Sequence, residues 1–173
     1  MDNILNALLI LSPIKLPMKP ADAIKLIEKA ITGHQPQRWA DLGCGNGTFT
    51  RALSSLLPAD SKVIAVDRER QNIPDFIQAD FINEDLQLGA IDGVLMANSL
   101  HYVKDKSKLI AKLNPPKLLV VEYDTTRSNP WVPYPVNYAN LAQLATELGY
   151  DAVKLTTQPS RFGGTMYSAL LSR

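Results

Sequence analysis

The sequence predicts an α/β fold built on a single, doubly wound, mostly parallel sheet of seven strands that ends in an antiparallel hairpin. Short apolar runs rich in β-branched residues alternate with amphipathic helical segments, which is typical of a parallel sheet. The last two runs are joined by a short connection that contains two glycines, which predicts a hairpin. A length of 173 residues is that of one domain, so we expect residues 1–173 to form a single domain.

Residues 3–11, NILNALLIL, are strongly apolar and predict an amphipathic helix that is too short to span a bilayer. No basic residue precedes this segment, which argues against a signal peptide. We expect residues 1–20 to hold this helix and a proline-containing linker. The sequence leaves three options open for this helix: it packs on the sheet, it covers the substrate as a lid, or it forms a dimer contact. Residues 21–32 predict a further helix, which ends at Gly33.

Residues 38–50, RWADLGCGNGTFT, contain the most informative motif. A short apolar strand ends at Asp41, a turn with Gly43, Gly45 and Gly47 follows, and a helix begins directly after it. Glycine has no Cβ, so the backbone can turn sharply and approach a ligand, and the free N–H groups of the helix face that ligand. This arrangement indicates a Rossmann-like nucleotide site. A tight turn without any ligand would use the same residues.

The spacing of the glycines argues against a dinucleotide. The motif is GxGxG, whereas the dinucleotide fingerprint is GxGxxG, in which the third glycine lets the helix pack closely on the strand. Thr48 occupies that third position. The turn therefore suits a ligand that has no diphosphate.

Polar side chains follow three further predicted strands, which lie at 62–67, 76–80 and 91–96. Open α/β sheets bind their ligands at this carboxyl edge. The carboxylate of Asp67, at the end of the first of these strands, can accept hydrogen bonds from both hydroxyls of a ribose. Asp80 and the aromatic ring that follows it suit an adenine amino group and ring face.

The remaining elements follow from the same patterns. The stretch between the second and third strands is eight residues long and contains Pro74, which excludes a long helix there. The expected order is strand, helix, strand, turn, strand, helix, strand, helix, strand, helix and two paired strands. The other helices are expected at 49–57, 105–113 and 140–148, and the other strands at 117–122, 151–157 and 165–171.

Taken together, these motifs resemble the class I S-adenosylmethionine-dependent methyltransferase family, most closely its small-molecule branch known as type 11. The resemblance rests on DLGCGNGTFT at 41–50, Asp67, ADF at 79–81 and NSLHYV at 98–103, in the order of the family. It implies that S-adenosylmethionine is the cofactor and that its methyl group is transferred to a small-molecule acceptor.

The resemblance also implies which residues bind the methionine and ribose parts of the cofactor. Gly43 and Gly45 would approach the methionine part, Asp41 would orient its amino group, and Asp67 would hold the ribose.

At the adenine end, the resemblance places Arg68 beside the ring and Asp80 against its amino group. Phe81 and Asn98 would line the cofactor. The helix that usually follows the second strand is reduced here to a turn, which changes one wall of the adenine pocket.

The acceptor is expected at the loops that leave the carboxyl edge of the sheet. Imidazole titrates near neutral pH, so His101 is the predicted catalytic base, with a place in the pocket wall as the alternative. Tyr102, Trp131 and Tyr134 are predicted to frame an aromatic pocket. The planar guanidinium of Arg161 is predicted to bind a substrate carboxylate or phosphate.

Charge and cysteine content narrow the class of partners. Eighteen basic and 17 acidic side chains give a formal net charge of +1, which provides no general electrostatic footprint for nucleic acid. Cys44 is the single cysteine, so the chain has no internal disulfide, and it fits a reducing, cytoplasmic location. We expect no metal site and no membrane partner, while the oligomeric state stays open.

Two other functions remain open from the sequence. The first is a catalytically silent subunit that binds S-adenosylmethionine and docks on a partner through the apolar segment at 3–11. The second is a nicotinamide-dependent oxidoreductase. The residues after the fourth strand, at 98–101, lack the Pro-Pro-aromatic pattern of enzymes that methylate nucleobase amino groups, but RNA and protein acceptors are not excluded.

Overall fold

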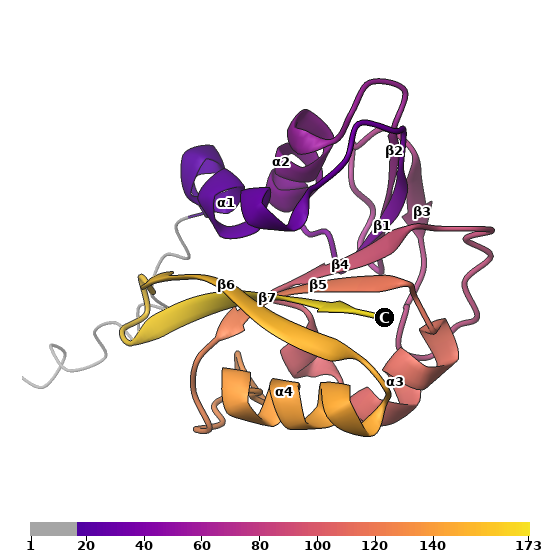
Figure 1. Cartoon of the computed structure of the whole chain (residues 1–173). Coiled ribbons are helices and arrows are strands. Elements are labelled where there is room, and N and C mark those ends of the chain that lie inside the picture. Colours follow the sequence, from indigo (N-terminus) through magenta and orange to yellow (C-terminus); the bar gives the residue numbers. More distant parts are fainter. Residues whose placement is uncertain (1–16) are drawn as a thin grey trace, which may run out of the picture.

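Seven strands form one mostly parallel sheet, as the sequence predicted, and their order in the sheet is β3-β2-β1-β4-β5-β7-β6 (Figure 1). The computed structural model describes residues 17–173, so the predicted apolar helix at 3–11 lies outside the described residues. Strand β7 runs antiparallel to both of its neighbours, and the other neighbouring pairs are parallel. The strands are β1 (Arg38–Leu42), β2 (Lys62–Asp67), β3 (Phe76–Gln78), β4 (Gly93–Ala97), β5 (Lys117–Tyr123), β6 (Asp151–Pro159) and β7 (Thr165–Ser172).

Helices cover both faces of the sheet, two on each side (Figure 1). Helices α1 (Pro20–Ile27) and α2 (Thr48–Leu56) lie on one face, and α3 (Lys106–Leu113) and α4 (Tyr138–Glu147) on the other. Short 3₁₀ helices follow α1 at Glu28–Ala30 and β4 at Leu100–Tyr102. Within residues 17–173, no helix has the length and apolar content that a membrane span requires.

The central strands are apolar on both faces because each face packs against helices. Successive side chains of a strand point to opposite sides of the sheet. On β1, Trp39 therefore packs with residues of α1 and α2, whereas Ala40 belongs to the core that contains residues of α3 and α4. This accounts for the nearly continuous apolar runs in the sequence of β1, β2, β4 and β5.

The prediction of a helix between the third and fourth strands is wrong. Between β3 and β4, residues 79–92 form turns rather than a helix. The Asp80 carboxylate accepts hydrogen bonds from the backbone N–H of Ile82 at 3.0 Å and from the side-chain amide of Asn83 at 2.8 Å, which fixes a local turn. Gly89 adopts φ +67°, which also interrupts a helix.

The winding of the sheet reverses at its centre, between β1 and β4. From β1 the chain proceeds to β2 and β3 on one side, and it then returns to β4 and β5 on the other side of β1. The connections at this point diverge, which opens a crevice outside the carboxyl ends of β1 and β4. The glycine turn leaves β1 directly into this crevice.

Candidate active site

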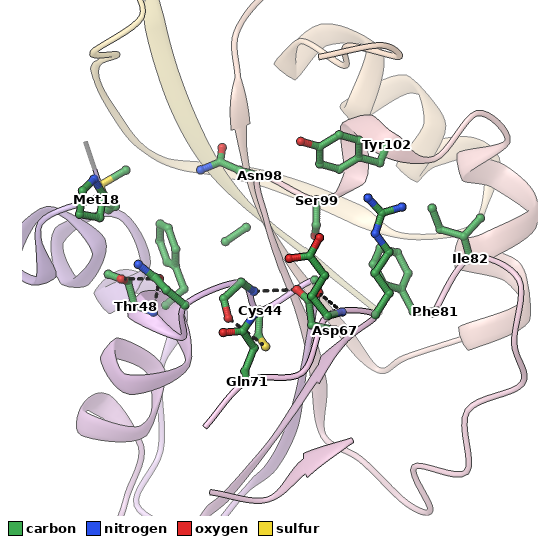
Figure 2. A pocket seen from close by; sticks show the side chains of 18 of the residues that line it. Met18, Cys44, Thr48, Asp67, Gln71, Phe81, Ile82, Asn98, Ser99 and Tyr102 are labelled. Carbon is green, nitrogen blue, oxygen red and sulfur yellow. Dashed lines mark hydrogen bonds between the residues drawn. The ribbon is translucent and has the colours of Figure 1, made fainter. Parts of the chain in front are cut away.

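A cavity of about 740 Å³ lies at the carboxyl ends of β1, β2, β4 and β5, and the turn between β6 and β7 closes one side of it. Its volume is that of a typical small-molecule site. Figure 2 shows Asp67 near its centre, with Phe81 and Ile82 on one side and Thr48 on the other. Among the residues that line it are seven of the predicted cofactor residues: Gly43, Gly45, Asp67, Arg68, Asp80, Phe81 and Asn98.

Gly43 and Gly45 both line the cavity, but their surroundings differ: Gly43 packs closely against the protein interior, and Gly45 does not. Both adopt positive φ, +50° at Gly45 and +76° at Gly43. A Cβ at Gly43 would lie 2.6 Å from the Cβ of Ser99, so the chain requires glycine here for packing. A Cβ at Gly45 would meet no heavy atom within 4 Å. The open space beside Gly45 therefore accommodates a ligand that approaches the backbone.

Asp41 lies behind this turn and does not line the cavity. Its side chain is buried, and Oδ2 accepts a hydrogen bond of 2.6 Å from the hydroxyl of Thr50. Oδ1 is buried and has no hydrogen-bond partner among residues 17–173. Burial raises the pKa of this carboxyl to about 7, since the Thr50 hydrogen bond offsets only part of the desolvation and the charge of Asp67 raises it further. A cationic ligand group nearby would favour the ionised form.

Asp67 joins the end of β2 to the glycine turn. Its Oδ2 accepts the N–H of Gly45 at 2.8 Å, and its Oδ1 accepts the N–H of Glu69 at 2.9 Å. Each carboxylate oxygen can accept more than one hydrogen bond. Asp67 thus holds the turn in place and keeps acceptor capacity toward the cavity.

The end of β3 provides Asp80 and Phe81. The hydrogen bond from the Asn83 amide holds the pKa of Asp80 below its ordinary value, so this carboxyl is ionised at neutral pH. Phe81 is nearly buried and presents a ring face to the cavity. Arg68 lies at the same end and is exposed. A carboxylate, an aromatic ring and a guanidinium therefore meet there, which is chemistry that suits adenine.

Asn98 follows β4 in a left-handed conformation, with φ +54°. Its backbone N–H donates to the carbonyl of Val121 at 2.8 Å, which ties it to β5. Its side-chain Oδ1 is buried and, within the described part of the chain, has no hydrogen-bond partner. An unusual backbone conformation combined with an unpaired buried oxygen is a feature of ligand sites rather than of ordinary turns.

His101, the predicted catalytic base, is not among the residues that line the cavity. Its ring is buried, and Nδ1 lies 2.8 Å from Oε2 of Glu122, at the end of β5. The backbone N–H of His101 donates to the other oxygen of the same carboxylate at 3.0 Å. Glu122 therefore holds the imidazole in the interior of the protein.

Of the predicted acceptor residues, Tyr102 and Arg161 line the cavity, while Trp131 and Tyr134 do not. Trp131 and Tyr134 are exposed, at 57% and 40%. The N–H of Tyr134 donates to the carbonyl of His101 at 3.0 Å. This bond holds the proline-rich loop against the outside of the turn that carries Tyr102, so its aromatic rings do not reach the cavity.

The structure adds lining residues that the sequence reasoning did not single out, among them Met18, Tyr123 and Phe162. Tyr123 ends β5 at the carboxyl edge, so the rule that directed attention to the other strand ends could have identified it. Met18 and Phe162 come from segments far apart in the sequence that only the tertiary structure brings to one cavity.

Comparison with known proteins agrees with this site. A family model described as a methyltransferase domain matches residues 40–114, which include the glycine turn, Asp67 and the turn after β4. A search of curated proteins finds no significant match.

Solved structures share the fold at low sequence identity. Magnesium protoporphyrin IX methyltransferase from Synechocystis, with bound S-adenosylmethionine, is 16% identical with a TM-score of 0.65 over 88% of this chain and 77% of that chain. The 1,6-didemethyltoxoflavin-N1-methyltransferase of Burkholderia thailandensis is 18% identical, with a TM-score of 0.61, over 87% and 79%. A methyltransferase from Aquifex aeolicus is 13% identical, with a TM-score of 0.58, over 90% and 100%. The match to the methyltransferase domain thus covers residues 40–114, and the fold of the chain is that of solved S-adenosylmethionine-dependent methyltransferases.

Proposed function

We propose that this protein uses S-adenosylmethionine to methylate a small-molecule acceptor. The observation that carries the proposal is the buried, unpaired oxygen of Asp41 behind a glycine turn that leaves open space in the cavity. The similar enzymes from Synechocystis and Burkholderia thailandensis are named for small-molecule substrates, a porphyrin and a toxoflavin precursor. A cavity of about 740 Å³ supports an acceptor in the size range of small molecules.

The side chains present fit the parts of the cofactor one by one. In this proposal Asp41 orients the ammonium group from behind the glycine turn, through a water molecule, and Asp67 faces the ribose hydroxyls, while Gly43 and Gly45 allow the methionine part to lie against the backbone. Carboxylates are the acceptors that suit both of these groups, and at Gly45 no side chain stands in the way.

The adenine is held in the same proposal by the end of β3. Asp80 accepts from the amino group, and Phe81 contacts the ring. Arg68 lies at the outer edge, and Asn98 lines the cofactor from the end of β4.

When bound, the cofactor supplies a methyl group on a positively charged sulfur, and the acceptor takes this methyl in line, leaving S-adenosylhomocysteine and releasing a proton if its nucleophile carries one. The chain contributes alignment and exclusion of water, which are the main requirements of such a displacement. We assign His101 a positioning part in place of the base predicted from the sequence. It ties Tyr102 and the turn after β4 to Glu122.

The affinity for S-adenosylhomocysteine is expected to rise with pH through about 7. Below that pH the Asp41 carboxyl is protonated in the free protein, because burial raises its pKa to about 7, and it must release its proton to pair with the ligand ammonium. Binding should be roughly tenfold weaker at pH 6 than at pH 8, as measured by isothermal titration calorimetry. The Asp41→Asn variant should bind weakly with a flat profile. A wild-type affinity that does not change between these two pH values would contradict the role of Asp41.

The class of acceptor can be tested by separating a cell extract into a dialysable and a retained fraction. Each fraction is incubated with the protein and S-adenosylmethionine, and formation of S-adenosylhomocysteine is measured. The proposal predicts turnover with the dialysable fraction, together with a metabolite that gains one methyl group. Turnover confined to the retained proteins and nucleic acids would refute a small-molecule acceptor.

A further inference from the structure

One side of the cavity is an aromatic wall, which we define as Tyr102, Tyr123 and Phe162. All three line the cavity, and they come from the turn after β4, the end of β5 and the turn between β6 and β7. The ring centroids of Tyr123 and Phe162 are 6.2 Å apart in an edge-on arrangement. The buried ring of His101 bridges the other two, with centroids 4.4 Å from Tyr102 and 5.8 Å from Tyr123.

The buried pair of His101 and Glu122 lies behind the two tyrosines of this wall. Glu122 accepts from both the ring and the backbone of His101, so the imidazole that separates the two tyrosines has a fixed orientation. A wall of aromatic rings recognises a flat, apolar group, because aromatic pairs prefer offset-stacked or edge-to-face contact.

Charge is distributed unevenly along the cavity. The acidic lining residues Asp67, Glu69 and Asp80 lie at the ends of β2 and β3, with the basic Arg68 among them, on the side assigned above to the cofactor. Among the described lining residues from β4 onward, Arg161 is the single charged side chain. On the side of the cavity with the aromatic wall, the charged group that faces the cavity is therefore the cation at the turn between β6 and β7.

The guanidinium of Arg161 is held in place but keeps capacity to bind. Its Nη1 donates to the carbonyl of Pro17 at 2.9 Å, which is the one hydrogen bond from this guanidinium within residues 17–173. An arginine side chain carries five N–H donors in a planar fork that matches a carboxylate. Most of these donors remain available to a ligand.

The two tyrosines of the wall carry no negative charge that would repel an anionic ligand. Burial, together with the nearby charge of Glu122, raises the pKa of Tyr123 to about 12, and burial raises that of Tyr102 as well. Both phenols are therefore neutral at physiological pH and can donate hydrogen bonds. The carboxylate of Glu122 lies behind the wall, where it contacts the imidazole ring of His101.

We propose that the acceptor is a planar aromatic compound that carries an anionic group, with its ring against the aromatic wall and its anion on Arg161. This inference rests on the proposed function, since it names the class of small molecule that the same cavity takes. It requires no residue outside the described part of the chain.

The test measures binding of three matched probes to the protein saturated with S-adenosylhomocysteine, by isothermal titration calorimetry. The probes are 2-naphthoate, which is planar and anionic, 2-naphthamide, which is planar and neutral, and decahydronaphthalene-2-carboxylate, which is anionic but not planar. We expect 2-naphthoate to bind roughly tenfold more tightly than either of the others, because it alone satisfies both the charge and the ring.

Two variants test which residue is responsible for the preference for the anion and which for the preference for the aromatic ring. Arg161→Gln should abolish the preference for 2-naphthoate over 2-naphthamide, whereas Arg127→Gln, in an exposed loop outside the cavity lining, should leave it unchanged. Phe162→Leu should reduce the preference for the aromatic ring over its saturated analogue. Because Arg161 and Phe162 are exposed on a turn, neither change should prevent folding, and unaltered binding of S-adenosylhomocysteine serves as the check.

Each outcome has a definite meaning. Equal affinity for naphthoate and naphthamide overturns the anionic part, and equal affinity for naphthoate and its saturated analogue overturns the aromatic part. If S-adenosylhomocysteine binds but none of the probes does, the acceptor class is wrong while the proposed function stands. If S-adenosylhomocysteine itself does not bind, the proposed function fails first.

Discussion

Replacement of Asp67 by alanine is expected to weaken the binding of S-adenosylhomocysteine by roughly 100-fold, because it removes the carboxylate that we propose accepts two hydrogen bonds from the ribose. The same change removes the acceptor that holds the N–H of Gly45 at 2.8 Å, so the glycine turn also loses an anchor. Isothermal titration calorimetry of the wild type and the variant measures the difference directly.

Two further variants separate these contributions. Asp67→Asn keeps an oxygen that can accept from Gly45 but loses the charge, so its affinity should lie between those of the wild type and Asp67→Ala. Asp151→Ala removes an exposed aspartate at the start of β6 and should bind as the wild type does. A dissociation constant of Asp67→Ala close to that of the wild type would show that the ribose is held elsewhere.

The second large effect distinguishes two glycines of the same turn. Gly43→Ala is expected to lower the free energy of unfolding by roughly 3 kcal/mol, since it adds a methyl 2.6 Å from the Cβ of Ser99 to a residue with φ +76°. Gly45→Ala should cost only about 1 kcal/mol, because its Cβ meets open space, but its methyl enters the space for the ligand. Its affinity for S-adenosylhomocysteine should fall roughly tenfold.

Gly33→Ala is the matched control for both variants. Gly33 also has a positive φ, +86°, with no heavy atom within 4 Å of a built Cβ, and it lies outside the cavity. It reports the cost of the left-handed conformation alone, as measured by urea unfolding. The account would be wrong if Gly43→Ala lost no more stability than Gly33→Ala, or if Gly45→Ala bound the ligand as tightly as the wild type.

Much of the sheet could be predicted because its local signals agree with its packing. The run KVIAVD at 62–67 coincides with β2, since a strand that is buried on both faces consists almost entirely of apolar, β-branched residues. The terminal hairpin was evident from its two apolar runs and the glycines between them. The mistaken helix between β3 and β4 shows the limit, because the side chain of Asp80 fixes a turn there through short-range hydrogen bonds.

The meeting of polar strand ends at one side of the cavity, the side we propose for the cofactor, was predictable for a related reason. Parallel strands end at one edge, so Asp67, Asp80 and Asn98 meet there whatever the details of packing. The acceptor side depends on side-chain orientation and on contacts between distant segments, which a sequence pattern does not contain. His101 turns inward because Glu122, 21 residues later, binds it, and Trp131 stays outside because its loop follows the turn after β4.

The central claim is that this cavity binds S-adenosylmethionine, and the most direct measurement is the thermal melting shift with S-adenosylmethionine, S-adenosylhomocysteine, NAD and NADH in parallel. At about 100 times its dissociation constant, a ligand should stabilise the protein by roughly 2.7 kcal/mol, which raises the melting temperature by several degrees. We predict this shift with the two sulfur compounds and none with the two nicotinamide compounds. A shift with NAD or NADH alone, or no shift with any of the four, would contradict the account.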